Sequence, residues 1–186
     1  SMQQGGQLID RKLIHHFPLA KQSLENAKTI GDPTFDDQSL ILNGKSSVEL
    51  AGLDKALRYR ADERFSISFW LRPDSLQNSV ILSRHNPGTT RPGIEIAIVD
   101  NGRVQFDLIT RWVAGVGRVT TRQSLPVAKW SHVAVTNDGS QSAGGQRVYF
   151  NGNLVETDIR HNTNSNVGGV DANRPMILGA GSRPGS

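Results

Sequence analysis

A serine and a histidine stand side by side in WSHVAVTNDG, residues 130–139, and these two residue types could form a nucleophile and its general base. The same stretch alternates in polarity with a period of two, which is typical of a β-strand. Neighbouring residues of a strand face opposite sides of a sheet, so Ser131 and His132 cannot make the hydrogen bond that this chemistry requires. We therefore expect Ser131 to share a side with Val133 and Val135, and His132 to lie on the strand surface.

Glu156 and Asp158 are a second candidate pair, because acids at this spacing lie on one face of a strand. Two carboxylates about 5 Å apart can act as nucleophile and acid in glycoside hydrolysis. This pair follows an Asn-Gly turn, where charged residues are normally solvated, and no third acid continues the pattern. Glu95 and Asp100 face opposite sides of a strand. The sequence therefore favours a chain without a catalytic site.

Aspartates in the loops raise another chemistry, the binding of calcium. Ca²⁺ takes six to eight oxygen ligands, usually including two or more carboxylates and some backbone carbonyls. Asp is also an ordinary turn residue, and no spaced motif such as an EF-hand loop selects among these positions. A structural Ca²⁺ stays an open alternative with unassigned ligands. The aspartates in or near loops are Asp36, Asp37, Asp100, Asp138 and Asp171.

Other metal and phosphate sites are disfavoured. His15 and His16 are adjacent on a predicted strand and face apart, and His85, His132 and His161 are scattered, which argues against zinc. No helix follows the glycine-rich segment 179–185, and the lysine of a phosphate-binding loop is absent. The chain has no cysteine, which excludes disulfides, thiolate metal sites and cysteine nucleophiles. We expect no cofactor other than the open Ca²⁺.

Length and charge limit the function classes further. The 186 residues suit one domain with a sizeable core. The pI is near 9.8, but each half of the chain has a net charge of only +2, with arginines interleaved among acids. This even spread differs from the basic arm or helix face of a nucleic-acid-binding protein. No apolar run approaches the roughly 18 residues that a membrane span needs.

Strand patterns recur along the chain. Phe65, Ile67, Phe69 and Leu71 alternate with Ser66, Ser68, Trp70 and Arg72, and hairpins are predicted around Asn43-Gly44, Asp100-Asn101-Gly102 and Asn151-Gly152. The helical patterns in LDKAL and LAKQSLENAK are weak. Many short strands between turn residues predict an all-β, antiparallel β-sandwich or jelly roll.

The run WSHVAVTNDGSQSAGGQRVYFNG resembles the laminin G-like jelly roll of the concanavalin A-like superfamily. RFSISFWLRPD, LIHHFPL, SLILNG and PMILGAG resemble further strands of that family, so that the resemblance covers roughly residues 12–181. The residues that carry it in the first run are Trp130, His132, Val133, Ala134, Val135, Thr136, Asp138, Gly139, Val148, Tyr149, Asn151 and Gly152.

The resemblance implies a domain organisation, and the sequence departs from the family pattern in one strand. Residues 1–11 are expected to be a tag remnant and N-terminal lead-in, and residues 12–186 the jelly-roll domain. Family members continue after the last matched strand with another strand that the sequence does not show. An edge strand left open in this way would favour a dimer formed by strand pairing.

A ligand surface is predicted from the outward positions of the strands. If Ile94, Ile96, Ile98, Val104, Phe106 and Leu108 face the core, then Glu95, Gln105 and Asp107 face away from it, as Tyr149 does on its own strand. Trp112 lies in a polar segment where an aromatic residue has no obvious core role. Aromatic rings with carboxylate and amide groups suit saccharide recognition, although outward polar residues are also what any solvated sheet shows. Trp70 and Trp130 are assigned to structure, with most of each ring buried.

These observations favour a non-catalytic recognition or adhesion module. The resemblance implies a glycan or a partner protein as the ligand, and a place in a larger, exported bacterial protein. A structural spacer without a ligand is the first alternative. A glycoside hydrolase is disfavoured, because the superfamily's β-glucanases carry a Glu-x-Asp-x-(x)-Glu cluster that is missing here.

Overall fold

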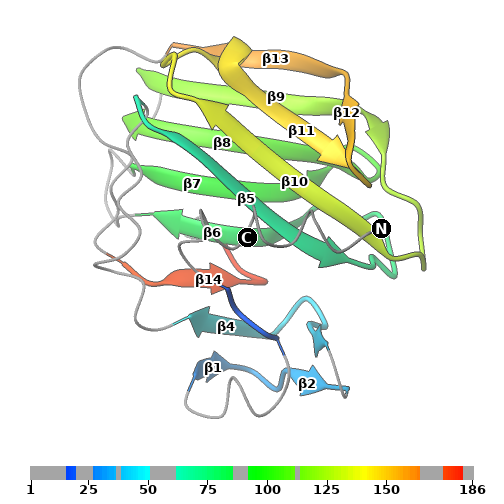
Figure 1. Cartoon of the computed structure of the whole chain (residues 1–186). Coiled ribbons are helices and arrows are strands. Elements are labelled where there is room, and N and C mark those ends of the chain that lie inside the picture. Colours follow the sequence, from blue (N-terminus) through cyan, green and yellow to red (C-terminus); the bar gives the residue numbers. More distant parts are fainter. Residues whose placement is uncertain are drawn as a thin grey trace, which may run out of the picture.

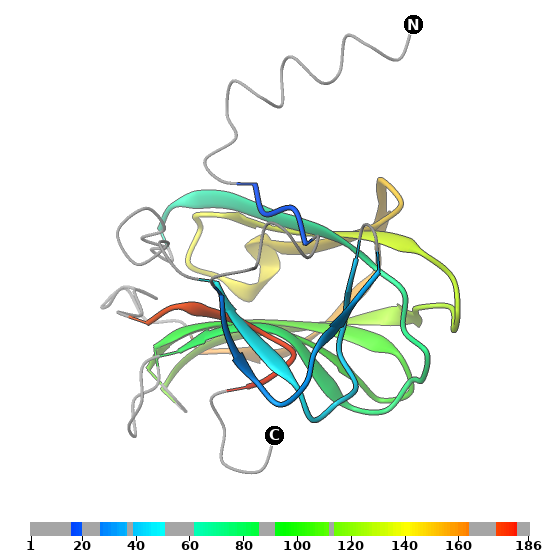
Figure 2. The same cartoon turned by 90° about the horizontal axis from the view of Figure 1, so that it is seen from below.

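The chain folds into two stacked antiparallel β-sheets (Figures 1 and 2). The computed structural model describes residues 16–19, 27–36, 39–50, 62–85, 92–111, 114–163 and 174–181. Within them the only helix is one 3₁₀ turn, η2 (Ala143–Gly145), and no helix is long and apolar enough to cross a membrane. The prediction of an all-β antiparallel sandwich is confirmed.

The larger layer is an eight-stranded sheet with the order β1-β4-β14-β6-β7-β8-β9-β13. Late strand β14 lies between β4 and β6, so the two ends of the domain are joined in one sheet. Its strands are β1 (Lys28–Ile30), β4 (Ser47–Leu50), β6 (Ser79–His85), β7 (Gly93–Val99), β8 (Arg103–Arg111), β9 (Gly115–Ser124), β13 (Thr157–Asn162) and β14 (Met176–Leu178).

The smaller layer is a four-stranded sheet with the order β12-β11-β10-β5 that lies over β6 to β9 (Figure 1). Residues 16–19 lie over β14 and β4, where Phe17 and Leu19 pack against the core (Figures 1 and 2). A separate two-stranded sheet pairs β2 with β3. The bounds are β5 (Arg64–Leu71), β10 (Ser131–Asp138), β11 (Gln146–Phe150), β12 (Asn153–Val155), β2 (Thr34–Phe35) and β3 (Leu40–Ile41).

The core lies between the two sheets, and the period of two in each strand fills it. Inward residues of β7, β8 and β10, such as Ile96, Phe106 and Val133, are fully buried. The rings of Phe65 on β5 and Phe106 on β8 meet edge to face, with centroids 6.5 Å apart. Ser131 is buried and His132 faces the other side, as the alternation predicts.

Two of the three predicted hairpins are confirmed. Strands β7 and β8 pair across Asp100-Asn101-Gly102, whose φ angles of 46°, 63° and 95° place all three residues in the left-handed region. Strands β11 and β12 pair across Asn151-Gly152 in the same way. These residue types tolerate positive φ, which is why the turn positions could be recognised.

The predicted hairpin at Asn43-Gly44 is wrong. Strand β3 pairs with β2, whereas β4 pairs with β1 and β14. The turn is closed by side chains: Asn43 accepts a hydrogen bond from the Lys45 amide, and the Ser46 hydroxyl accepts one from the Asn43 amide. The turn redirects the chain between sheets because each flanking strand finds its partner far away in sequence. The predicted helical segment LDKAL and most of LAKQSLENAK lie outside the described residues.

Candidate functional site

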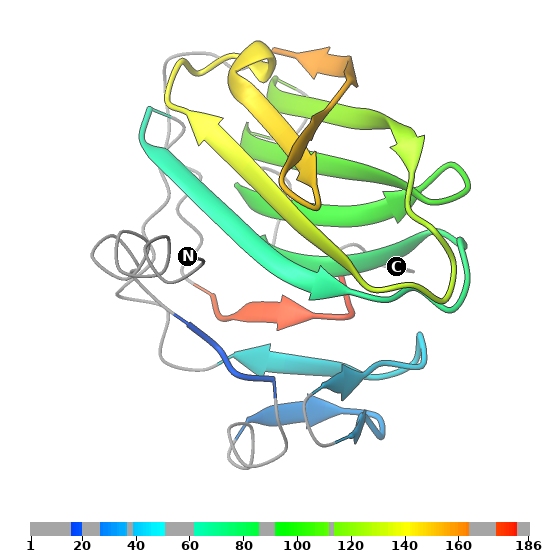
Figure 3. The ribbon, with the colours of Figure 1, turned by 45° about the vertical axis from the view of Figure 1, so that its right-hand side comes forward.

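The structure separates the predicted ligand residues onto two faces of the sandwich (Figure 3). Glu95, Gln105 and Asp107 lie together on the side of the eight-stranded sheet that faces away from the core. Tyr149 lies on the outward side of the four-stranded sheet, and Trp112 is outside the described residues. The two faces differ in burial and in chemistry, so each is described in turn.

A polar row crosses the outward side of the eight-stranded sheet. The strand register places Ser83, Glu95, Asp107, Arg118 and His161 next to one another on β6, β7, β8, β9 and β13. Although these residues point away from the core, Glu95 is only 3% exposed and Asp107 is 0% exposed. We expected a solvated surface here, and the burial of these two carboxylates is a difference that strand periodicity could not reveal.

Asp107 and Arg118 form the centre of this row. The Arg118 Nε and Nη2 groups donate to Asp107 Oδ1 and Oδ2 at 2.8 and 2.5 Å, and Gln105 Nε2 donates to Oδ2 at 3.3 Å. Burial by itself lowers the pKa of Arg118, but the hydrogen bonds and charge of Asp107, with the charge of Glu95, raise that pKa above its ordinary value. Both oxygens of Asp107 are therefore engaged by the protein itself.

Glu95 also has a buried neighbour, His85, on the adjacent strand β6. Its Oε2 lies 3.4 Å from His85 Nε2, and both side chains are 3% exposed. The carboxylates predicted to bind a ligand are thus enclosed by groups of the same sheet. Their role in ligand binding stays a prediction, and the geometry favours a structural role.

Glu156 and Asp158, the pair considered for glycoside hydrolysis, are held by arginines. Asp158 accepts hydrogen bonds from Arg122 Nε at 2.7 Å and Arg103 Nη2 at 2.8 Å, and Glu156 accepts one from Arg122 Nη1 at 3.2 Å. The hydrogen bonds from Arg122 and Arg103 lower the pKa of Asp158. A carboxylate kept ionised in this way does not suit the proton-donor role of a glycosidase.

The loop aspartates considered for calcium bond to their own loops. Asp36 Oδ1 accepts from the Ser39 amide at 2.6 Å, and Asp138 Oδ1 accepts from the Ser140 amide at 2.8 Å. Asp37 and Asp171 lie outside the described residues. In the described part of the chain, no group of three or more His, Asp or Glu residues could hold a metal ion. A Ca²⁺ site stays an untested prediction.

Two tryptophans are exposed, one on the outward side of β5 and one immediately before β10. Trp70 is 63% exposed and Trp130 is 50% exposed. The prediction that most of each ring is buried is wrong, because the alternation of β5 puts Trp70 in the outward set with Ser66 and Ser68. The period of the strand gives the direction of the Trp70 ring, and that direction is outward.

Trp70 and His132 form an aromatic pair at one end of the outward side of the four-stranded sheet. They are direct partners in the register of β5 and β10, and their rings lie 5.3 Å apart at 59°. The backbone of His132 is fixed by Asn151, which accepts from the His132 amide through Oδ1 at 2.9 Å and donates its own amide to the His132 carbonyl at 2.8 Å. A rigid hairpin therefore holds this aromatic pair from one side.

The rest of the outward side follows from the same register. Beyond Trp70 and His132 comes a row formed by Ser68, Ala134, Tyr149 and Leu154, and then a row formed by Ser66, Thr136 and Arg147. Leu154 is 62% exposed. We call this surface the aromatic face; it comprises Ser66, Ser68, Trp70, His132, Ala134, Thr136, Arg147, Tyr149 and Leu154.

Comparison with known proteins identifies the family. A family model described as the concanavalin A-like lectin/glucanases superfamily matches residues 42–186. The chain belongs to this superfamily. The resemblance noted in the sequence is thereby confirmed. The matched residues include the whole four-stranded sheet and every strand of the eight-stranded sheet except β1.

Relatives and solved structures extend the comparison. Botulinum neurotoxin type X of Clostridium botulinum is 27% identical over 137 residues, which are 72% of this chain and 10% of the toxin. This superfamily domain is therefore similar to about one-tenth of the length of that relative. A Ruminococcus gnavus sialidase CBM40 bound to α2,3-sialyllactose aligns with a TM-score of 0.51 and 16% identity over 65% of each chain. A structure of botulinum neurotoxin type C, described by its interaction with two ganglioside molecules, aligns with a TM-score of 0.52 and 16% identity over 92% of this chain and 44% of that one. At these identities the solved structures show a shared fold.

Proposed function

We propose that this chain is a non-catalytic recognition module that binds a glycan on its aromatic face. The observation that carries the proposal is the exposure of Trp70, at 63%, on a regular strand where its ring is paired with His132. Soluble proteins rarely gather large apolar side chains on one open surface unless the surface binds something. Tyr149 and Leu154 extend the apolar area in the next row of the face.

The chemistry of this face suits a sugar. A pyranose ring has apolar C–H faces that pack on an indole and hydroxyl groups that exchange hydrogen bonds with serine, threonine and tyrosine side chains. Trp70 and Tyr149 supply the rings, and Ser66, Ser68 and Thr136 supply hydroxyls on the same surface. Two χ angles fix each ring, so that little conformational entropy is lost when a ligand binds.

The similar proteins support a binding function. Two of the solved structures are described with sialyllactose and with gangliosides as ligands, and both share this fold. The toxin relative supports a place in a larger exported protein, since this chain matches only a small part of its length. Fold alone does not assign a ligand, so that the choice of a glycan rests on the residues of the aromatic face.

A protein partner is the second candidate, and Leu154 is the observation that favours it. Its side chain is 62% exposed beside Tyr149, and an exposed leucine offers a sugar fewer specific contacts than it offers a protein. One of the similar structures is a botulinum neurotoxin binding domain in complex with synaptotagmin II, with 15% identity and a TM-score of 0.52 over 82% of this chain and 38% of that one. A protein ligand would depend on Leu154 as strongly as on Trp70.

Titration calorimetry after a glycan-array screen tests the proposal. We expect Trp70→Ala to weaken binding of the best glycan at least about tenfold. An aromatic residue that dominates an interface commonly contributes about 2 kcal/mol or more, and about 1.4 kcal/mol corresponds to a factor of ten. Ile159→Ala is the matched control, since Ile159 is an exposed apolar residue (53%) on the other sheet. Equal binding by the wild type and the Trp70 variant would contradict the proposal. Release of reducing ends from the bound glycan would contradict the non-catalytic part of it.

A further inference from the structure

We infer that the aromatic face selects an oligosaccharide that carries a carboxylate, with one sugar ring on Trp70 and the carboxylate at Arg147. This inference rests on the proposed function and adds the class of ligand. The observation that carries it is a guanidinium at the end of the face opposite Trp70, which has no acidic partner among the described residues.

Arg147 is exposed and, among the described residues, has no acidic partner within ion-pairing distance. Three arginines on the eight-stranded sheet are bound to acids instead: Arg118 pairs with Asp107, and Arg122 and Arg103 pair with Asp158. The guanidinium of Arg147 is therefore available to a ligand, whereas those three already have carboxylate partners.

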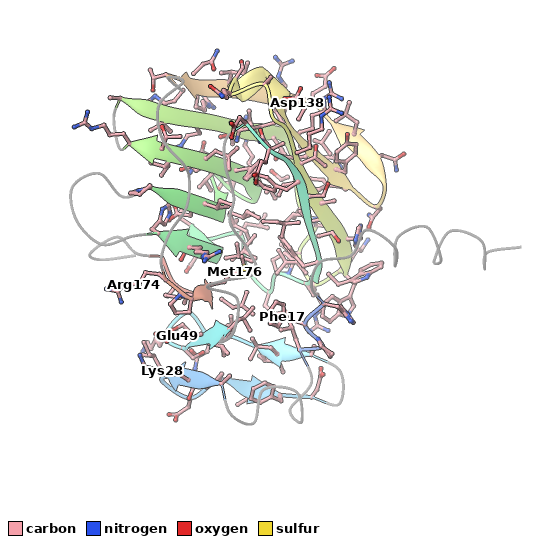
Figure 4. All side chains as sticks on the ribbon, turned by 60° about the vertical axis from the view of Figure 1, so that its left-hand side comes forward. Phe17, Lys28, Glu49, Asp138, Arg174 and Met176 are labelled. Atoms are coloured by element: carbon pink, nitrogen blue, oxygen red, sulfur yellow. The ribbon has the colours of Figure 1, made fainter. Side chains whose placement is uncertain are left out.

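The surroundings of Arg147 have a positive excess. Arg64 and Asp138 are opposite each other in the register, and Arg64 Nε donates to the backbone carbonyl of Asp138 at 3.3 Å. Hydrogen bonds from Ser140 lower the pKa of Asp138, and the charges of Arg147 and Arg64 lower it further. One ionised carboxylate thus lies near two guanidinium groups, at the end of β10 where Figure 4 labels Asp138.

The spacing along the strands determines the size of the ligand. Arg147 pairs with Thr136, and Trp70 pairs with His132, so the two rows are separated by the length of β10 from His132 to Thr136. At about 3.3 Å per residue this separation is roughly 13 Å. The row between them contains the small side chains of Ser68 and Ala134 on β5 and β10, and Tyr149 on β11. Arg147 on β11 is also two strands away from Trp70 on β5, at about 4.8 Å per strand. A single sugar ring on Trp70 cannot reach Arg147, but an oligosaccharide that runs diagonally across these three strands can.

The type of anion follows from the arginine. A guanidinium presents a planar pair of N–H donors that matches the two oxygens of a carboxylate, and such charge-assisted pairs are stronger than neutral hydrogen bonds. Neighbouring Thr136 and Ser66 supply hydroxyl groups for the sugar that bears the carboxylate. Uronic acids and sialic acids are the two sources of such a group.

Calorimetry with matched acidic and neutral glycans tests this inference. The probes are tetragalacturonate with its methyl ester, and 3′-sialyllactose with lactose, so that each arm represents one source of the carboxylate. We expect at least one acidic glycan to bind about tenfold more tightly than its neutral partner at low salt, with the advantage shrinking as salt screens the charges. Arg147→Gln should remove that advantage, and Arg147→Lys should keep part of it.

Arg160→Gln is the control variant, because it removes the same charge from an exposed position on the other sheet. A loss of affinity equal to that of Arg147→Gln would overturn the inference, since it would reflect net charge alone. Equal binding of acidic and neutral glycans that still depends on Trp70 would overturn the inference and leave the proposed function standing. Failure of all four probes would overturn the inference; failure of every glycan on a wider array would remove the proposed function as well.

Discussion

The outward sides of the two sheets use polar and aromatic residues in opposite ways. On the eight-stranded sheet, Glu95 and Asp107 are almost fully buried and have Arg118 and His85 as neighbours. On the four-stranded sheet, Trp70 is mostly exposed and its neighbours leave its ring open to solvent. In the sequence the charges of the eight-stranded sheet look functional, but the structure buries them; we call this outward side the closed side. The aromatic residue Trp70 of the four-stranded sheet looks structural, but the structure exposes it; we call this outward side the open side. Burial and pairing, rather than residue type, distinguish the proposed binding surface from the other outward side.

The largest expected effect concerns the closed side. Asp107→Asn removes the charge that balances Arg118, whose side chain is 15% exposed, and leaves that guanidinium without its ionised partner. We expect the free energy of unfolding to fall by about 3–5 kcal/mol, as measured by urea denaturation. Addition of Arg118→Gln should recover part of the loss, because the guanidinium that lost its carboxylate partner is then also removed. A loss below about 1 kcal/mol in the single variant would contradict the structural role of this pair.

A paired substitution compares the two sides for ligand binding. Tyr149 and Gln105 were both predicted to bind the ligand, and they lie on opposite sides of the sandwich. We expect Tyr149→Ala to weaken glycan binding several-fold and Gln105→Ala to leave it unchanged, in the same calorimetric titration. The reverse result would move the binding site to the polar row.

Trp70→Ala tests whether the open side contributes to stability. Since the ring is 63% exposed, we expect the free energy of unfolding to change by less than about 1 kcal/mol. Thermal and urea denaturation of the variant measure this. A loss of about 3 kcal/mol or more, typical of a large buried aromatic residue, would assign Trp70 to the core instead.

The smallest expected effect is a pH dependence of the free energy of unfolding, which comes from Asp158 on the eight-stranded sheet. Hydrogen bonds from Arg122 and Arg103 lower the pKa of Asp158 in the folded state, so its contribution is fully present above the unfolded value of about 3.9. That contribution is lost as the pH falls through the folded pKa. Asp158→Asn should therefore show a shallower loss of stability below about pH 4 than the wild type, in urea titrations at several pH values. Parallel curves for the two proteins would contradict this pairing.

Much of the fold could be predicted because its signals are local. The period of two gave the facing of Ser131, His132 and Trp70, and turn residues that tolerate positive φ gave the hairpins at Asn101 and Asn151. The partner of β4 could not be predicted from its neighbouring turn, because it pairs with β14, which lies more than a hundred residues away in the sequence. Register between distant strands depends on tertiary packing, which local propensities do not encode.

The candidate site was only partly predictable, for a related reason. The direction of Glu95, Gln105 and Asp107 followed from alternation, but their enclosure depends on Arg118 from a neighbouring strand. The exposure of Trp70 depends on the absence of a further layer over the four-stranded sheet within the described residues. An outward tryptophan opposite a histidine was the available signal.

The most direct test is a ¹H–¹⁵N NMR titration of the domain with the tightest-binding oligosaccharide. Indole N–H signals of the three tryptophans and backbone amides of both sheets report the location of the ligand independently of any substitution. We predict shifts at the Trp70 indole and at the amides of β5, β10 and β11, with those of β7 and β8 unchanged. Shifts confined to the amides around Glu95 and Asp107 would contradict the assignment of the binding site to the aromatic face.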